Sequence, residues 1–264
     1  MKLITLVENT SRCDLKAKHG LSLYLETEKH KLLFDLGPDG TLFENAEKLG
    51  VDLAAVDTVV ISHGHYDHGG ALGAFLARNH TAQVYLQRGA FAPHFSKAGL
   101  LKLPIGLDPS LAQHPQVHLL DGDAEIDEEL SVFTVSDTSR CHSPMNDVLL
   151  DDKGKDRFAH EQNLVIRGGE TVLLTGCGHC GIVNIMHQAA PLQPKYCIGG
   201  FHLFNLALRK TAPVPLLDEI AAALAAYPET VFYTCHCTGE KALRYLVAKT
   251  PNLRALHCGD ELTL

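Results

Sequence analysis

The hexapeptide HGHYDH brings four possible metal ligands together: His63, His65, Asp67 and His68. A neutral imidazole donates a nitrogen lone pair to an ion such as zinc, and a carboxylate adds negative charge. In a tight loop, the first two histidines can point one way while Asp67 and His68 point the other, which would serve two neighbouring ions. A polar surface loop would gain nothing from packing these side chains together. The spacing therefore predicts a metal site.

Three further histidines lie just after strand-like runs: His179 after TVLLT, His202 after KYCIGG and His236 after TVFYT. The HGHYDH loop likewise follows the run VDTVVIS, and most of these loops lead into a segment with helical spacing. Strands that alternate with helices favour an α/β layered fold, in which ligands bind beyond the carboxyl ends of the strands. The four loops are therefore expected to converge on one site, although they lie far apart in sequence.

One of these histidines, His179, lies inside CGHC, which raises two other hypotheses. Cys177 and Cys180 at this spacing are typical of a dithiol/disulfide exchange site. Alternatively, the two could join Cys235 and Cys237 in a structural zinc site. An exchange motif is expected early in a small domain, whereas this one is late and follows a hairpin. A four-cysteine site would leave HGHYDH unexplained. The histidine-based metal site is favoured, and both alternatives stay open.

Periodicity and turn residues predict several other elements. The expected elements are a hairpin from the runs at 21–27 and 31–37, a helix over 41–49 closed by Gly50, and a helix over 215–227 opened by Pro215. The segment 137–161 is polar and lacks a period, which is typical of a functional or mobile loop. No linker divides the chain, so a single domain over residues 1–264 is expected.

Composition limits the class of function. The 264 residues carry a formal net charge of −8 with scattered lysines and arginines, which argues against a nucleic-acid or anionic-membrane surface. The N-terminal apolar run is too short for a signal peptide and no stretch could span a bilayer, so a cytoplasmic location is expected. Eight cysteines without a secretion signal are expected to be thiols. The count of 16 histidines is unusual, and histidine is the commonest metal ligand.

The order of LLFDLG, then VVISHGHYDHGG, then the strand-end histidines resembles the metallo-β-lactamase fold family. Within that family, the segments LVENT, HGLSLYLET, HEQNLVI, TGCGHCGIVNI, GGFHL and HCTGEKA are similar to one subgroup. The subgroup includes a dihydropterin-methyl ribofuranosylaminobenzene phosphate synthase. The resemblance covers nearly the whole chain. It implies a four-layer αβ/βα sandwich with metal ions at one edge, between the two sheets.

The resemblance also implies how the ligands are shared between two divalent ions. His179 would join the first two histidines of HGHYDH around one ion. His236 would join Asp67 and His68 around the other. Cys177 stands where the wider family has an aspartate that bridges the ions, and it could bind as a thiolate or only line the pocket. Zinc is the expected metal, with manganese or iron as alternatives.

Such a centre predicts metal-centred catalysis. Two divalent ions lower the pKa of a bound water and polarise a phosphoryl or carbonyl oxygen. Asp67 could orient the nucleophile or accept its proton, and His202 could line the pocket as a proton donor or phosphate contact. Asp35 could fix the ring of a metal-bound histidine, or could simply form a turn. The expected substrate is a small anionic or phosphorylated molecule. The sequence predicts no nucleic-acid or membrane partner and leaves the oligomeric state open.

Three functions remain possible for this centre: hydrolysis, a synthase-like transfer that forms a carbon–carbon or carbon–nitrogen bond, and metal-dependent binding without turnover. Arg209 and Lys210 could hold an anionic group, although a charged approach to a helix is the commoner explanation. His142 and His160, which flank the irregular segment, could face substrate, but a solvated surface position is favoured for each. The remaining histidines have no strand-end context and receive no predicted role: His19, His30, His80, His94, His114, His118, His187 and His257.

Overall fold

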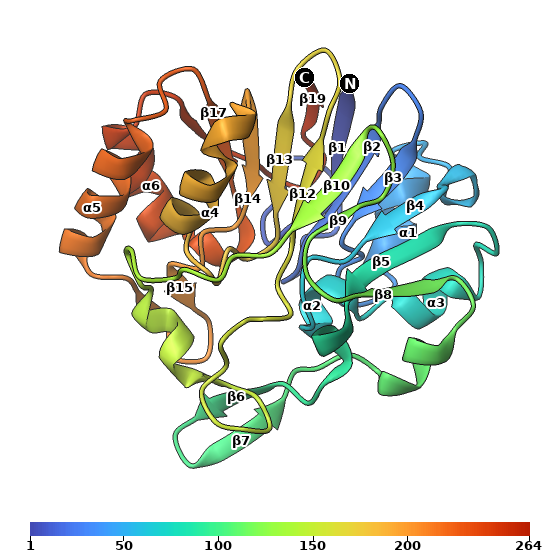
Figure 1. Ribbon diagram of the computed structural model, residues 1–264, viewed down its shortest axis with the longest axis horizontal. Helices are drawn as coiled ribbons and strands as arrows, with labels where there is room; N and C mark the ends of the chain where they lie inside the picture. The colour runs from blue at the N-terminus through green and yellow to red at the C-terminus, as the bar shows by residue number, and fades with distance from the viewer.

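The computed structural model, which describes residues 1–264, contains two seven-stranded sheets packed face to face (Figure 1). The first has the order β19-β1-β2-β3-β4-β5-β8. Its strands are β1 (Lys2–Val7), β2 (Ser22–Glu26), β3 (Lys31–Phe34), β4 (Thr58–Val60), β5 (Gln83–Gln87), β8 (Val117–Leu120) and β19 (Glu261–Thr263). Strands β19 to β3 pair antiparallel, which confirms the predicted early hairpin, and β3 to β8 run parallel.

The second sheet has the order β18-β17-β14-β13-β12-β10-β9. Its strands are β9 (Ala124–Glu125), β10 (Leu130–Phe133), β12 (Asn163–Ile166), β13 (Val172–Thr175), β14 (Tyr196–Gly199), β17 (Val231–Thr234) and β18 (Leu253–Ala255). Strands β13, β14, β17 and β18 run parallel, and the others pair antiparallel. The parallel group places the loops after β13, β14 and β17 at one edge.

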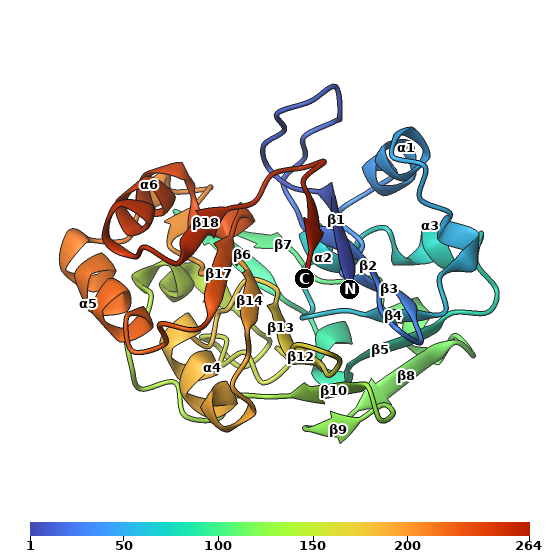
Figure 2. The same ribbon diagram turned by 90° about the horizontal axis from the view of Figure 1, so that it is seen from above.

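Helices cover the outer face of each sheet (Figure 2). The helices are α1 (Thr41–Lys48), α2 (Tyr66–Gly69), α3 (Leu72–Leu76), α4 (Ile182–Ala189), α5 (Val214–Leu224) and α6 (Glu240–Lys249). Short 3-10 turns lie at Leu53–Ala55, Arg88–Phe91, Pro109–Gln113, Pro144–Val148, Ala190–Leu192 and His236–Thr238. The predicted helices at 41–49 and 215–227 are confirmed as α1 and α5. No helix combines the length and apolar character that a bilayer crossing requires.

Side-chain alternation along the strands builds three apolar cores. In β2, Leu23 and Leu25 face the opposing sheet, whereas Tyr24 faces the helical side. In β13, Leu174 faces the inner core and Leu173 faces the helical side. Because both sheets are buried on both faces, the architecture is the predicted four-layer αβ/βα sandwich.

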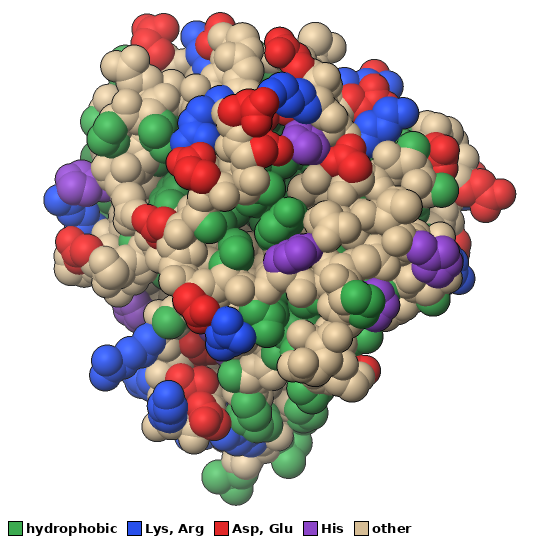
Figure 3. Space-filling model, turned by 45° about the vertical axis from the view of Figure 1, so that its right-hand side comes forward, with side chains coloured by type: hydrophobic (Ala, Val, Ile, Leu, Met, Phe, Trp, Pro, Cys, Tyr) green, Lys and Arg blue, Asp and Glu red, His purple; other side chains and the backbone are tan.

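Two smaller sheets lie beyond the edge that carries the histidine loops. One contains β6 (Phe95–Ala98), β7 (Leu101–Pro104) and β11 (Leu149–Leu150), and the other pairs β15 (Phe204–Asn205) with β16 (Lys210–Thr211). The irregular segment 137–161 is therefore tied to hairpin β6–β7 through β11. The hairpin exposes Leu100, Leu101 and Leu103. Figure 3 shows hydrophobic side chains at the lower end of the molecule.

Candidate metal centre

The first set of ligands gathers from two sheets. His63 and His65 follow β4 in the first sheet, and His179 follows β13 in the second. His63 Nε2 lies 3.0 Å from His65 Nδ1 and 3.3 Å from His179 Nε2. All three side chains are buried. Gly176 allows this approach, because a Cβ at that position would lie 2.0 Å from Ser62 Oγ in the ligand loop.

Hydrogen bonds on the far side of these rings fix where the protons are. His63 Nδ1 contacts Ser62 Oγ at 2.8 Å, and that hydroxyl donates to Asp35 Oδ2 at 2.8 Å. His179 Nδ1 lies 3.0 Å from Asn146 Oδ1, while Asn146 Nδ2 donates to His179 O. Both Nδ1 atoms therefore carry the proton, and the two Nε2 lone pairs face each other.

The second set repeats this arrangement. His68 Nε2 lies 3.1 Å from His236 Nε2, and Asp67 Oδ2 lies 3.3 Å from His236 Nε2. His68 Nδ1 donates to Asp35 Oδ2 at 2.6 Å, and His236 Nδ1 donates to Asn9 Oδ1 at 2.8 Å. Because each ring has its partner on Nδ1, the inner Nε2 atoms of His68 and His236 are left to bind either a metal ion or a proton.

Converging lone pairs repel one another unless a cation lies between them, and partners on the outer nitrogen are typical of metal-bound histidine. Burial and the neighbouring imidazoles hold the pKa of His63, His65 and His179 well below the ordinary value, so these rings are neutral and able to bind metal. Although burial opposes ionisation, His68, His19 and other partners hold the pKa of Asp67 well below its usual range. The donor chemistry of both sets therefore fits divalent metal ions.

The two sets differ in how protons compete with metal. Burial disfavours a charged ring, but the carboxylates of Asp35 and Asp67 outweigh it and raise the pKa of His68 to about 9 in the metal-free protein. Below that pH a proton occupies His68, so binding of the second ion should weaken by about tenfold per pH unit on acidification. The first set is already neutral above about pH 6.5.

We therefore expect the affinity of the second ion, but not of the first, to rise steeply between about pH 6.5 and pH 8.5. A chelator-competition titration at several pH values would measure both affinities. Equal slopes for the two ions would contradict this assignment.

The structure separates the cysteines that the two rival hypotheses group together. Cys177 Sγ lies 3.2 Å from His68 Nε2, at the ligands. Cys180 packs in the core under the helices, and Cys235 packs in the core between the sheets. All eight cysteines are free. Because Cys180 and Cys235 lie on opposite faces of the second sheet, the geometry does not support a shared four-cysteine site. Cys177 and Cys180 are both buried, and their sulfurs contact different groups.

His202 lies at the wall of the first set. Its ring centroid is 4.2 Å from that of His179, and both of its ring nitrogens are buried without a hydrogen-bond partner. Its backbone has a φ of 45°, and its carbonyl accepts a hydrogen bond from Ser143 Oγ at 2.6 Å. An unpartnered ring held this firmly can exchange a proton with a bound molecule.

Several supporting residues were not found from the sequence. His19, which received no predicted role, lies with Nε2 3.2 Å from Asp67 Oδ2. Glu161 accepts the backbone N–H groups of His179 and Cys180, which fixes the turn after β13. Asn9 in LVENT and Asn146 hold ligand rings but have no distinctive spacing. The only indication that these residues have a role was that they lie in loops next to the predicted site.

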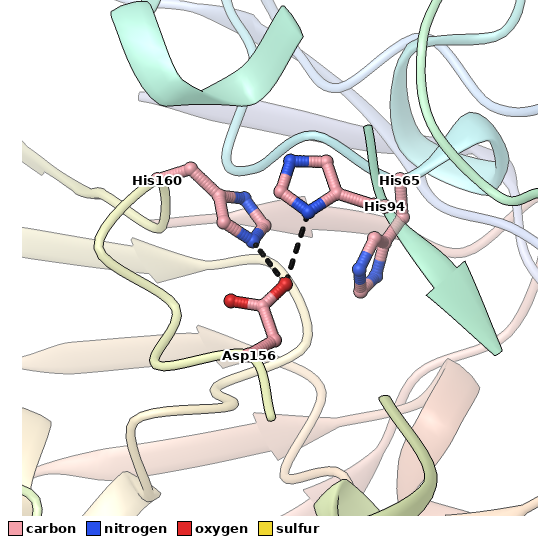
Figure 4. Close-up of side chains that lie close together, drawn as sticks. All are labelled: His65, His94, Asp156 and His160. Atoms are coloured by element: carbon pink, nitrogen blue, oxygen red, sulfur yellow. Dashed lines mark hydrogen bonds and ion pairs between the residues drawn. The ribbon is translucent and has the colours of Figure 1, made fainter. Parts of the chain in front are cut away.

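A second buried cluster supports the ligand loop from behind (Figure 4). His94 Nδ1 and His160 Nε2 both contact Asp156 Oδ2, at 3.0 and 3.1 Å. His160 Nδ1 accepts the backbone N–H of Gly64, between the first two ligands. The prediction that His160 lies at the surface is wrong, because this network buries it, whereas His142 is exposed as predicted. The Gly64 bond leaves the proton of His160 on Nε2, so that nitrogen serves as a donor to Asp156 rather than as a metal ligand.

Replacing Asp156 with asparagine should loosen the ligand turn, because Oδ2 accepts from both histidines while Oδ1 accepts the Phe158 N–H at 2.7 Å, and an amide has only one accepting oxygen. We expect the affinity of the first ion to fall by about tenfold, at the lower end of the effect of outer-shell changes. Metal titration of Asp156→Asn against the exposed neighbour Asp152→Asn would measure this. An unchanged first-ion affinity in Asp156→Asn would remove the network from the support of the site.

Two cavities reach the ligands. The larger, of about 1060 Å³, touches His236 and is bordered by Arg209, Lys210 and Lys241, none of which forms an ion pair. The smaller, of about 390 Å³, touches His179 beneath the segment 137–161. A bound molecule could therefore approach from either side.

The family model of the metallo-beta-lactamase superfamily matches residues 16–149, so the chain belongs to that superfamily. A solved metal-dependent hydrolase of the superfamily, Tm1679, shares 27% identity and a TM-score of 0.84 over 100% of this chain and 99% of its own. The chain is also 25% identical to 7,8-dihydropterin-6-methyl-4-(beta-D-ribofuranosyl)-aminobenzene-5'-phosphate synthase of Methanocaldococcus jannaschii, over 98% of this chain and 95% of that protein. The uncharacterized protein MJ0448 of the same organism is 25% identical over 91% of this chain and 92% of its own.

Proposed function

We propose that the protein is a metal-dependent hydrolase that binds two divalent ions and acts on a small anionic, phosphorylated substrate. The observation that carries the proposal is the pair of ligand sets, in each of which ring nitrogens face one another while partners fix the outer nitrogens. His63, His65 and His179 would hold one ion, and Asp67, His68 and His236 the other. The superfamily and the hydrolase relative support this class of activity.

Zinc suits the mixed nitrogen, oxygen and sulfur donors, and manganese or iron would accept the histidines and carboxylate. When bound, two such ions generate a nucleophile at neutral pH and neutralise charge on the scissile group. The side chains of the protein orient the ligands and carry the protons. Asp35 orients His68 and, through Ser62, His63, so that the ligands meet the ions in one geometry.

Asp67 and His202 are the proposed proton carriers. Asp67 is the only carboxylate in the two ligand sets, and its side chain keeps a small exposed area beside His19. It would orient the nucleophile or accept its proton. His202 has two free ring nitrogens and would donate to the leaving group or contact a phosphoryl oxygen. Asp67 lies in the second ligand set and His202 lies beside the first. One could therefore remove a proton from the nucleophile while the other delivers a proton to the leaving group.

The cavity beside His236 supports an anionic substrate. The Arg209, Lys210 and Lys241 side chains border it in a protein whose formal net charge is −8. Because these three basic side chains have no carboxylate partner, they would attract and hold a phosphate group, although the protein as a whole is negatively charged.

A transferase is the second candidate, because a relative aligned over 98% of this chain and 95% of its own length is a synthase. In that case the same ions would hold a phosphorylated substrate while a second organic molecule attacks. The ligand geometry is compatible with both reactions.

Turnover assays on the zinc-loaded and chelator-treated protein would distinguish these functions. The substrates would be phosphomonoesters, phosphodiesters, lactones, thioesters and pterin diphosphates, each with and without an arylamine co-substrate. We expect metal-dependent release of phosphate or alcohol from a phosphoester without a co-substrate. Strict dependence on the arylamine would establish the transferase instead, and two bound ions without turnover on any class would favour a binding protein.

A further inference from the structure

The sulfur of Cys177 lies between the two ligand sets. Besides its 3.2 Å contact with His68 Nε2, Cys177 Sγ lies within 4.8 Å of ring nitrogens of both sets. These nitrogens belong to His63, His68, His179 and His236. Two ligands of one tetrahedral ion are separated by roughly 3.5 Å, given metal–ligand bonds of about 2.0–2.3 Å. One sulfur atom is therefore within reach of an ion in either set.

The surroundings of this thiol differ from those of three other buried cysteines. Cys180, Cys197 and Cys235 each pack in an apolar core. Cys177 is just as buried, at 3% exposed, yet belongs to none of the three cores. It is surrounded by imidazole rings whose lone pairs need a cation. A buried thiol in such a place can lose its proton to solvent when metal binds, because the metal replaces the proton on sulfur.

Cys237 is the neighbour that could compete for this role. Its sulfur accepts the backbone N–H of His202 at 3.3 Å and lies 3.4 Å from the carbonyl oxygen of Cys177. Gly200 makes room for it, because a Cβ there would lie 2.5 Å from Cys237 Sγ. These contacts connect the loop after β17 to the loops after β13 and β14. Cys237 is therefore a positioning residue, and its sulfur is already occupied by main-chain groups.

We propose that the thiolate of Cys177 bridges the two ions, which rests on the binuclear centre proposed above. Asp67 then contributes to one set only, and the shared ligand is sulfur. A bridging thiolate selects thiophilic ions such as zinc, cobalt or iron(II) over manganese and magnesium. It also couples the sets, so that loading of one ion pre-orients the ligand needed by the other.

Cobalt(II) replacement reports directly on sulfur ligation, because a thiolate–cobalt bond gives a charge-transfer absorption in the near ultraviolet. Titrating the metal-free protein with cobalt, we expect the band to appear as the second ion binds, because the thiol loses its proton when the bridge between the two ions forms. Cys177→Ser should lose the band, and its second-ion affinity should fall by more than the ~10–100-fold typical of outer-shell changes. Cys177→Asp should bind two ions without the band, because a carboxylate can bridge in place of sulfur. Cys180→Ser and Cys237→Ser should keep the band.

X-ray absorption at the zinc edge measures the number of sulfur neighbours per zinc ion, independently of the cobalt spectra. A bridging thiolate predicts about one sulfur neighbour per zinc near 2.3 Å, whereas a terminal thiolate on one ion predicts about one half. Two bound ions with no sulfur neighbour, a half count, or loss of the band in Cys237→Ser would each overturn the bridge and leave the binuclear hydrolase intact. Failure of the wild-type protein to bind two ions would overturn both proposals.

Discussion

His179→Ala is expected to lose the first ion and nearly all turnover. His179 Nε2 faces His63 Nε2 at 3.3 Å, and it is the only ligand that the second sheet supplies to the first set. Its removal leaves two histidines on a single loop, too few for the three protein ligands typical of a catalytic ion. If the ion contributes about 4 kcal/mol to transition-state stabilisation, activity should fall by about 10³-fold. Metal analysis of the purified variant and kcat/KM would measure the two losses.

Cys180→Ser is the matched control for this substitution. It changes the next residue of the same turn, but the side chain packs in the core under the helices and contacts no ligand ring. We expect its metal content and kcat/KM to match the wild type, with at most a modest loss of stability. Full metal stoichiometry in His179→Ala would remove His179 from the ligands.

Asp35→Asn is expected to have the next largest effect, on both stability and the second ion. The carboxylate is fully buried and accepts hydrogen bonds from Ser62 N, Ser62 Oγ and His68 Nδ1, at 2.7, 2.8 and 2.6 Å. An asparagine amide presents N–H groups to one of these donors, so at least one buried group loses its partner. The expected costs are about 2–4 kcal/mol of unfolding free energy and ~10–100-fold in affinity for the second ion.

Asparagine is preferred over alanine here because Asp35 has a left-handed φ of 61°, which asparagine tolerates. Denaturant unfolding of the metal-free variant measures stability without the metal contribution. The exposed Asp121, which pairs with Arg88 at the surface, provides the control Asp121→Asn and should leave both quantities unchanged. A normal second-ion affinity in Asp35→Asn would show that His68 is positioned by other contacts.

The sequence predicted the architecture because strand ends carry a clear signal. A β-branched run followed by glycine and histidine marks the loops after β4, β13 and β17, and parallel pairing then places those loops at one edge. The spacing of HGHYDH explains why His63 and His68 belong to different sets. Which remote histidine joins which set came from the family resemblance, because spacing alone does not relate loops more than a hundred residues apart.

The supporting network could not be predicted in the same way. His94, Asp156 and His160 come from irregular segments whose paths depend on pairing between β6 and β11. No local period distinguishes such a residue from a surface one, which is why the expected exposure of His160 was wrong. Whether a polar side chain in a loop is buried depends on packing against segments that are distant in sequence. A single sequence shows the residue type at that position but not those distant contacts.

Anomalous scattering at the zinc edge, from crystals of the zinc-loaded protein, would locate the ions directly. We expect two peaks about 3.5–4 Å apart, as in other two-metal sites, one among His63, His65 and His179 and the other among Asp67, His68 and His236. An absence of peaks between these side chains, or a single peak at the His94–Asp156–His160 cluster instead, would contradict the binuclear centre.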